Sequence, residues 1–323
     1  MPKRRQGGGE GFKPTHQSSH GNPMSKAETI LHALHSAPEV DRRKFLRSQS
    51  FPSMLYKFKA VDIKKPHILE DIVVGSRLYL SSPELFNDPF DMMPRVTVEG
   101  DLSSLLTKIK SLPAPSPQAK QDAIRKAQSI WQEHGWPGIS NEFKIQESAE
   151  ALFRETGVFC FSTSCKGSEN DSASRESGPR NNLMWSHYGD SHRGICLQFQ
   201  VFRYPLILRR LVRVSYSDSF PEINWISPAF EQECLYAATN KHSRWSYENE
   251  WRHVQPNSAG SYLHFEPGFL SGIILGAKIS ESSIGEISRI LGRRDQMGLP
   301  PLKKYRAEMK QGSYQIKLSR WIT

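Results

Sequence analysis

Cysteine is scarce in this sequence, with four residues among 323, and no two of them form a Cys-x-x-Cys pair. This spacing argues against a zinc ribbon and a disulfide scaffold, and it favours a reducing, cytoplasmic location. Long apolar runs are also lacking. No stretch reaches the roughly 18 apolar residues of a transmembrane helix, and the N-terminus has no apolar segment typical of a secretory signal. The sequence therefore predicts a protein without a membrane partner.

Acidic residues are too few to balance the basic ones, and the imbalance lies at the two ends of the chain. The formal net charge is +10, of which residues 1–50 contribute +5 and residues 291–323 contribute +6, so the middle of the chain is close to neutral. A basic end suits either a nucleic-acid contact or a solvated tail. Because large apolar side chains are almost absent from residues 1–24, we expect residues 1–50 to form a basic, largely disordered tail with a short helix at 25–36.

The remaining residues, 51–323, predict a single α+β domain with a mixed, mostly antiparallel sheet, because short strand-like segments outnumber helical ones. Helical periodicity interrupted by Pro and Gly predicts an inserted helical region at about 100–156. Seventeen residues without a large aliphatic or aromatic side chain predict a mobile loop at 166–182. Strands are predicted at 54–58, 77–81, 158–163, 194–199, 212–216, 249–255, 272–275 and 314–318, and further helices at 65–75, 229–245 and 281–291.

Two motifs combine turn-forming or polar residues with aromatic ones. In the first, Phe86 to Phe90, Asn87 and Asp88 precede a proline and form a turn that is either a rigid structural loop or a loop that positions a ligand. The second runs from Met184 to Gly194 and contains two histidines, Asp190, one tryptophan and one tyrosine. Its His187 is a candidate acid, base or substrate-orienting group; the alternatives are a metal site and purely structural hydrogen bonding.

Two further motifs carry carboxylates and hydroxyls. Glu248 and Glu250 lie where a helix is expected to run into a strand. We expect one of them to face a cleft and the other to pair with Arg252 or Lys241, although a salt-bridged surface would also explain the pattern. Ser162 begins a Ser-Thr-Ser sequence at the end of a strand, where hydroxyls either terminate a turn or contact a ligand.

The combination of these motifs resembles a bacterial domain family of unknown function. The matching features are a Leu-Tyr-Lys-Phe start at Leu55, the Phe-Asn-Asp-Pro-Phe motif, a Cys-Phe-Ser strand, Met-Trp-Ser-His-Tyr with a later His-x-Gly, and Trp-Ser-Tyr-Glu-x-Glu-Trp-Arg. The resemblance extends over about residues 54–320 and implies no settled activity.

More remotely, the chain resembles the ADP-ribosyltransferases, whose fold is a split mixed sheet that holds NAD in its cleft. The order of the motifs is similar: Lys57 on the first strand, Ser162 in a Ser-Thr-Ser element in the middle, and a Glu-x-Glu element at Glu248 and Glu250 late in the chain. One branch of that family has arginine where this chain has Lys57. The resemblance implies an α+β ADP-ribosyltransferase-like core with inserted helices.

The same resemblance implies that NAD is the substrate and that ADP-ribose is transferred to a nucleic acid or protein acceptor, in a toxin or phage-defence setting. One carboxylate would hold the ribose and stabilise an oxocarbenium-like state, and the other would orient or deprotonate the acceptor. Loop 166–182 would be a lid or a target-recognition loop. The implied catalytic residues are Glu250, Glu248, Ser162 and His187, and the implied NAD-binding residues are Tyr56, Lys57, Arg77, Asn87, Asp88, Trp185 and Tyr188.

Two alternatives from other classes stay open. One is a non-catalytic module that binds a nucleotide or nucleic acid, with the basic ends adding affinity. The other is a metal-dependent nuclease built on Asp88, His187, His192 and Glu250. Geometry separates them, because the transferase hypothesis requires Glu248 or Glu250 to share a cleft with Ser162 and Lys57.

Overall fold

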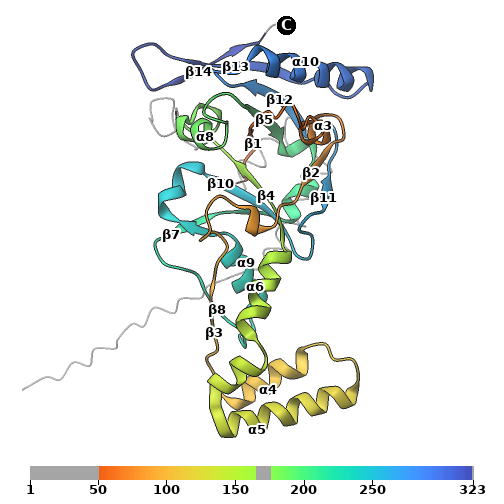
Figure 1. The fold of residues 1–323 in the computed structure, drawn as a ribbon, viewed down its shortest axis with the longest axis vertical. Helices are drawn as coiled ribbons and strands as arrows, with labels where there is room; N and C mark the ends of the chain where they lie inside the picture. Colours follow the sequence, from red (N-terminus) through yellow and green to blue (C-terminus); the bar gives the residue numbers. More distant parts are fainter. Residues whose placement is uncertain (1–50, 165–175, 322–323) are drawn as a thin grey trace, which may run out of the picture.

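The computed structural model describes residues 51–164 and 176–321, so the expectations for the tail 1–50 and for most of loop 166–182 lie outside the described residues (Figure 1). An eight-stranded sheet forms the centre of the molecule, in the order β14-β13-β12-β5-β1-β4-β10-β6. All neighbouring strands in it are antiparallel except β12 and β13. The fold is therefore α+β with a mostly antiparallel open sheet, as the sequence predicted.

The strands of this sheet are short and bounded by turns. They are β1 (Met54–Lys59), β4 (Gly157–Ser162), β5 (Ile195–Gln200), β6 (Leu211–Arg213), β10 (Glu250–Gln255), β12 (Leu270–Leu275), β13 (Lys303–Met309) and β14 (Ile316–Arg320). Three strand pairs lie outside it: β2 (Arg77–Tyr79) with β11 (Tyr262–His264), β3 (Arg95–Thr97) with β8 (Glu222–Asn224), and β7 (Ser215–Ser217) with β9 (Asn240–His242).

Helices cover the two faces of the sheet. On β5, Leu197 faces a core that also contains residues of α3 (His67–Val73) and α10 (Glu281–Gln296), whereas its neighbour Cys196 faces a second core beside α8 (Asn182–His187). Successive strand residues point to opposite faces, so these helices lie on opposite sides of the sheet. Among the described residues, no helix is both long and apolar enough to cross a membrane.

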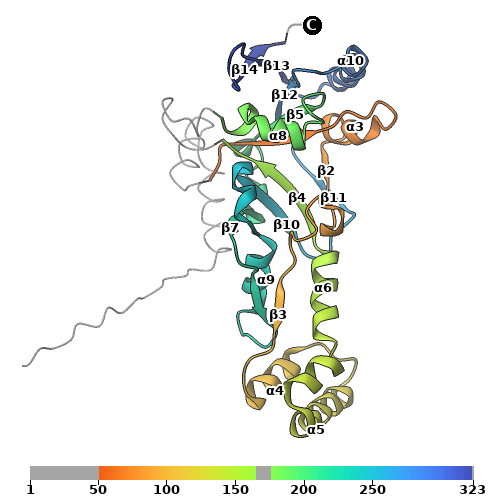
Figure 2. The same cartoon turned by 60° about the vertical axis from the view of Figure 1, so that its left-hand side comes forward.

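Three helices extend from one end of the sheet, where the sequence predicted a helical insertion (Figures 1 and 2). They are α4 (Leu102–Ser111), α5 (Pro117–Glu142) and α6 (Ile145–Glu155). The side chains of Asp101 and Ser116 cap the first two helices, and Gly135 adopts φ 55°, which kinks α5 where the sequence indicated a break. The helices share a hydrophobic core of their own, which includes Trp225 from outside the insertion.

The structure corrects several expected element boundaries. The helix expected at 229–245 is α9 (Phe230–Ala238) and ends early, because the next residues form β9 and pair with β7. The strand expected at 212–216 is divided at Val214 into β6 and β7, which have different partners. Helix α10 continues past Gly292 to Gln296, where the buried Arg294 donates hydrogen bonds to the backbone carbonyls of Val73, Pro267 and Pro300.

The sheet opens between β1 and β4. Strand β1 forms six residue pairs with β5, and β4 forms six with β10, but β1 and β4 share only the pair Tyr56–Ser162. Beyond this pair the two strands no longer make ladder contacts, and a cavity lined by both strands lies there. The opening brings residues from distant parts of the sequence to one place.

Candidate functional site

The cavity between β1 and β4 has a volume of about 650 Å³, within the range of about 300–1,000 Å³ that small-molecule sites occupy. Both Glu248 and Glu250 line it together with Ser162 and Lys57, so the geometric condition for the transferase hypothesis is met. Eight of the eleven predicted site residues line it: Tyr56, Lys57, Arg77, Asn87, Ser162, Tyr188, Glu248 and Glu250.

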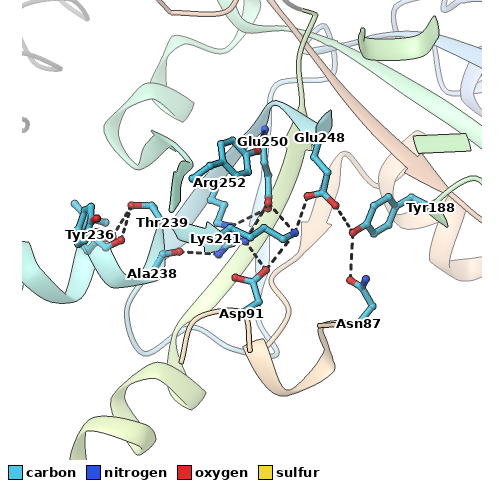
Figure 3. A network of polar contacts seen from close by, with 12 residues as sticks. Asn87, Asp91, Tyr188, Tyr236, Ala238, Thr239, Lys241, Glu248, Glu250 and Arg252 are labelled. Atoms are coloured by element: carbon cyan, nitrogen blue, oxygen red, sulfur yellow. Dashed lines mark hydrogen bonds and ion pairs between the residues drawn. The ribbon is translucent and has the colours of Figure 1, made fainter. Parts of the chain in front are cut away.

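Figure 3 shows a buried charge network, four of whose five members line the cavity: Asp91, Lys241, Glu248 and Glu250. The Lys241 ammonium lies 2.7 Å from Glu248 Oε2, 3.3 Å from Glu250 Oε2 and 3.4 Å from Asp91 Oδ2. The Arg252 guanidinium donates to Glu250 at 2.9 and 3.1 Å and to Asp91 at 2.7 Å. The expectation that only one glutamate pairs with a cation is therefore wrong: both bind Lys241, and both face the cavity.

The two glutamates have different protonation behaviour. Burial alone would raise the pKa of Glu250, but Arg252 and Lys241 hold this pKa well below its usual value, so Glu250 stays ionised. Burial raises the pKa of Glu248, and the charge on Glu250 adds to the increase, although Lys241 and the hydrogen bond from Tyr188 oppose it. A pair of carboxylates whose pKa values are driven apart in this way is typical of acid–base sites.

The network carries a charge that depends on one proton. It contains two cations and three carboxylates. It is therefore neutral when Glu248 is protonated, and it has a charge of −1 when Glu248 is ionised. The Tyr188 hydroxyl, 2.6 Å from Glu248 Oε1 and 3.4 Å from Asn87 Oδ1, connects this carboxylate to the Asn87 turn.

Two buried oxygens at the cavity have no hydrogen-bond partner among the described residues. They are Ser162 Oγ and Asp91 Oδ1. Ser162 lies between Tyr56 and Glu250 in register across three strands, so the three side chains lie on the same face of the sheet. Because an unpaired buried polar group costs about 1–3 kcal/mol, these atoms fit a site that supplies hydrogen-bond partners when a ligand binds.

Two lysines of β1 bring positive charge to the cavity. Lys57 and Lys59 are two residues apart on β1 and therefore share a face. Neither forms an ion pair with a described carboxylate; Lys57 instead lies 4.8 Å from the centre of the Phe159 ring. Burial, together with the charge of Lys57, lowers the pKa of Lys59 to about 8. Arg77 also lines the cavity, but Asp71 at 2.6 Å already neutralises it.

Three of the predicted site residues lie elsewhere. The Trp185 side chain is completely buried, donates to the carbonyl of Pro179 and packs edge-on against Phe58, so it belongs to the core and cannot stack on a ligand in the cavity. Asp88 and His187 line a neighbouring cavity of about 620 Å³.

This second cavity adjoins the first. Asp91 and Lys241 line both, and His187 Nδ1 lies 2.7 Å from the Tyr247 hydroxyl in the second one. The described end of the expected loop, residues 176–182, contains a helical turn over Gly178–Arg180 and leads into α8.

The four residues proposed for a metal-dependent nuclease are divided: Asp88 and His187 share the second cavity, whereas His192 and Glu250 lie elsewhere. His192 is buried and stacked on Trp185, while Glu250 is occupied by Arg252 and Lys241. Over residues 51–164 and 176–321, no group of three or more His, Cys, Asp or Glu side chains has an arrangement that could hold a metal ion.

Sequence reasoning missed Lys59 and Asp91 as site residues. The Lys-x-Lys alternation along β1 was a usable signal for Lys59, because it places both ammonium groups on one face. Asp91 gave no local signal, since its partner Arg252 is 161 residues away.

Residues 184–253 match the model of a family described as "Protein of unknown function (DUF2971)". The matched segment runs from α8 to β10 and contains Tyr188, Lys241, Glu248 and Glu250. This match supports the resemblance to an uncharacterised family. The comparisons with curated proteins and with solved structures found no match.

Proposed function

We propose that this protein transfers ADP-ribose from NAD to a macromolecular acceptor, with the NAD bound in the cavity between β1 and β4. The observation that carries the proposal is the convergence of Glu248, Glu250, Ser162 and Lys57 on one cavity in an open sheet. A mostly antiparallel sheet that opens around its ligand is also the architecture that the ADP-ribosyltransferase resemblance implies.

In the proposed reaction, the bond between the ribose C1′ and the nicotinamide nitrogen breaks. Nicotinamide leaves with the bonding electron pair, and an acceptor nucleophile forms the new bond to C1′. The oxocarbenium-like transition state is positively charged, and the network with Glu248 ionised carries the compensating charge of −1. Glu248 then takes the acceptor's proton, which suits a carboxylate whose pKa burial raises above its usual value.

The remaining residues fit the parts of NAD. Lys57 and Lys59 are cations without a described carboxylate partner, as a pyrophosphate group requires. The unpaired hydroxyl of Ser162 supplies a hydrogen bond to a ribose hydroxyl. Tyr56 and Tyr188 line the same cavity and offer aromatic surface to the nicotinamide ring. Glu250 remains ionised and holds Lys241 against Glu248.

The test uses NAD that is labelled in its adenylate phosphate. The purified full chain is incubated with this NAD and a cell lysate, and both nicotinamide release and label transfer are measured. Glu248→Gln should lower turnover by about 10²- to 10⁴-fold, the usual contribution of a general base. Glu231→Gln, at an exposed position on α9, is the matched control and should leave turnover unchanged.

Binding is measured separately from chemistry. Replacing Lys57 and Lys59 together by glutamine should weaken NAD binding by at least tenfold, because each charge-assisted hydrogen bond contributes about 1.5–3 kcal/mol. If the wild type neither binds NAD nor releases nicotinamide, or if Glu248→Gln behaves like the wild type, the proposal is wrong. Nicotinamide release without transferred label would assign NAD hydrolysis to the same site.

A further inference from the structure

Strands β13 and β14 form a two-sided ribbon at the edge of the sheet (Figure 1). In-register pairs of antiparallel strands share a face. On one face Tyr305, Ala307, Ile316 and Leu318 pack into the core beside α8. The opposite face therefore holds the alternate residues of both strands, and they are polar.

The polar face is strongly basic. Its cations are Lys304, Arg306 and Lys317, and Lys310 continues the same alternation at the turn, where its backbone pairs with Gln315. None of these four cations forms an ion pair with a described carboxylate. The one acidic residue of the face, Glu308, accepts a hydrogen bond from Ser319. This ribbon accounts for most of the positive charge of residues 291–323.

We propose that this ribbon binds double-stranded nucleic acid through its phosphates, independently of base sequence. The phosphates of a duplex present one negative charge per about 3.4 Å along each strand, so a straight row of cations can follow them. Alternate residues of a strand lie about 6.6–6.8 Å apart, so the cations form a row and not a cluster. Strand β14 has no further neighbour in the described sheet, which leaves the row open at its edge.

A membrane surface is a poorer fit for the same charges. Binding at a lipid interface draws on buried apolar area in addition to charge. The basic face offers little of this, since its one large apolar side chain, Trp321, is partly buried and packs against the core. The proposal does not depend on NAD chemistry, because the test measures binding alone and three strands, β13, β12 and β5, lie between β14 and β1 in the sheet.

The test is a salt titration of binding between the full chain and a fluorescent 30-base-pair DNA duplex. Each phosphate contact contributes about −0.9 to the slope of log K against log salt concentration. Replacing the exposed Lys310 and Lys317 together by alanine should make this slope less steep by about 1.8. Replacing both by arginine should retain the wild-type slope.

The matched control replaces Lys64 and Lys65, two exposed lysines in the turn before α3, by alanine. It removes the same charge from another surface and should leave the slope unchanged. The difference between the two double variants also removes any contribution from the basic residues 1–50, which both retain. The proposal is overturned if the two variants behave alike, if no duplex binding occurs at 50 mM salt, or if the chain binds phosphatidylserine vesicles but not the duplex.

Discussion

Arg252 supports the charge balance of the buried network, and its replacement by methionine tests that balance directly. The side chain is completely buried, and its guanidinium donates to Glu250, to Asp91 and to the backbone carbonyl of Ala238 at 2.9 Å. Methionine preserves much of the volume but removes the charge, so three carboxylates would be left with Lys241 as their one described cation. Removing one partner of a buried ion pair typically costs about 3–5 kcal/mol, and we expect a loss of this size in the free energy of unfolding.

The measurement is urea unfolding at pH 7 and pH 3, followed by tryptophan fluorescence. The folded-state pKa of Glu250 is depressed, so the stability that Glu250 contributes is present above its unfolded pKa, about 4.5, and is lost as the pH falls through the folded value. The cost of Arg252→Met should therefore be smaller at pH 3 than at pH 7. A double variant that also carries Asp91→Asn should cost less than the sum of the two single changes by about 1–3 kcal/mol. A cost below about 1 kcal/mol at pH 7, or the same cost at both pH values, would refute the argument.

Three further predictions concern single side chains. Burial lowers the pKa of His253 from 6.5 to about 4. Because the unfolded chain takes up the proton first, the free energy of unfolding should fall by about 3 kcal/mol as the pH drops from 6.5 to 4. In His253→Gln the free energy of unfolding should depend less on pH over this range. Tyr188→Phe removes a hydrogen bond that lowers the pKa of Glu248, so the acidic limb of the rate of nicotinamide release should move to higher pH; an unshifted limb would mean that Glu248 is not the group that titrates. Trp185→Ala should cost about 3–5 kcal/mol of stability without changing NAD affinity in the folded protein, and a stable variant that no longer binds NAD would show that Trp185 belongs to the site after all.

The local sequence pattern predicted strands correctly where a strand is buried on both faces. The apolar runs of β4 and β5 are buried on both faces, so their sequences predicted strands without any knowledge of their partners. Strand β13 was missed because four of its seven residues, Lys303, Lys304, Arg306 and Glu308, are charged, and its apolar residues pack on only one face. The helical pattern of the sequence also continues past Ala238, but the structure has no helix there, because these residues form β9 and pair with β7.

In the candidate site, too, the sequence indicated the residue types, and tertiary contacts decided how they are arranged. The residue types and order of Lys57, Ser162, Glu248 and Glu250 indicated a carboxylate-based chemistry from sequence alone. The spacing of Lys241, Glu248 and Glu250 in the sequence did not reveal that the lysine binds both glutamates, because the position of Lys241 depends on β9 pairing with β7.

By itself, the sequence determined the strand-rich α+β character of the chain, eight of the residues that line the cavity and the basic excess of its C-terminal part. Those properties follow from composition and from local periodicity, which act within a few residues. Tertiary structure alone decided that β1 and β4 part after one pair, that Trp185 is core and not ligand surface, and that the C-terminal cations form a row on a ribbon. The physical reason is that strand order and register join distant residues, up to 15 positions apart in the ribbon and more than a hundred between β1 and β4, and neither is encoded in any short segment.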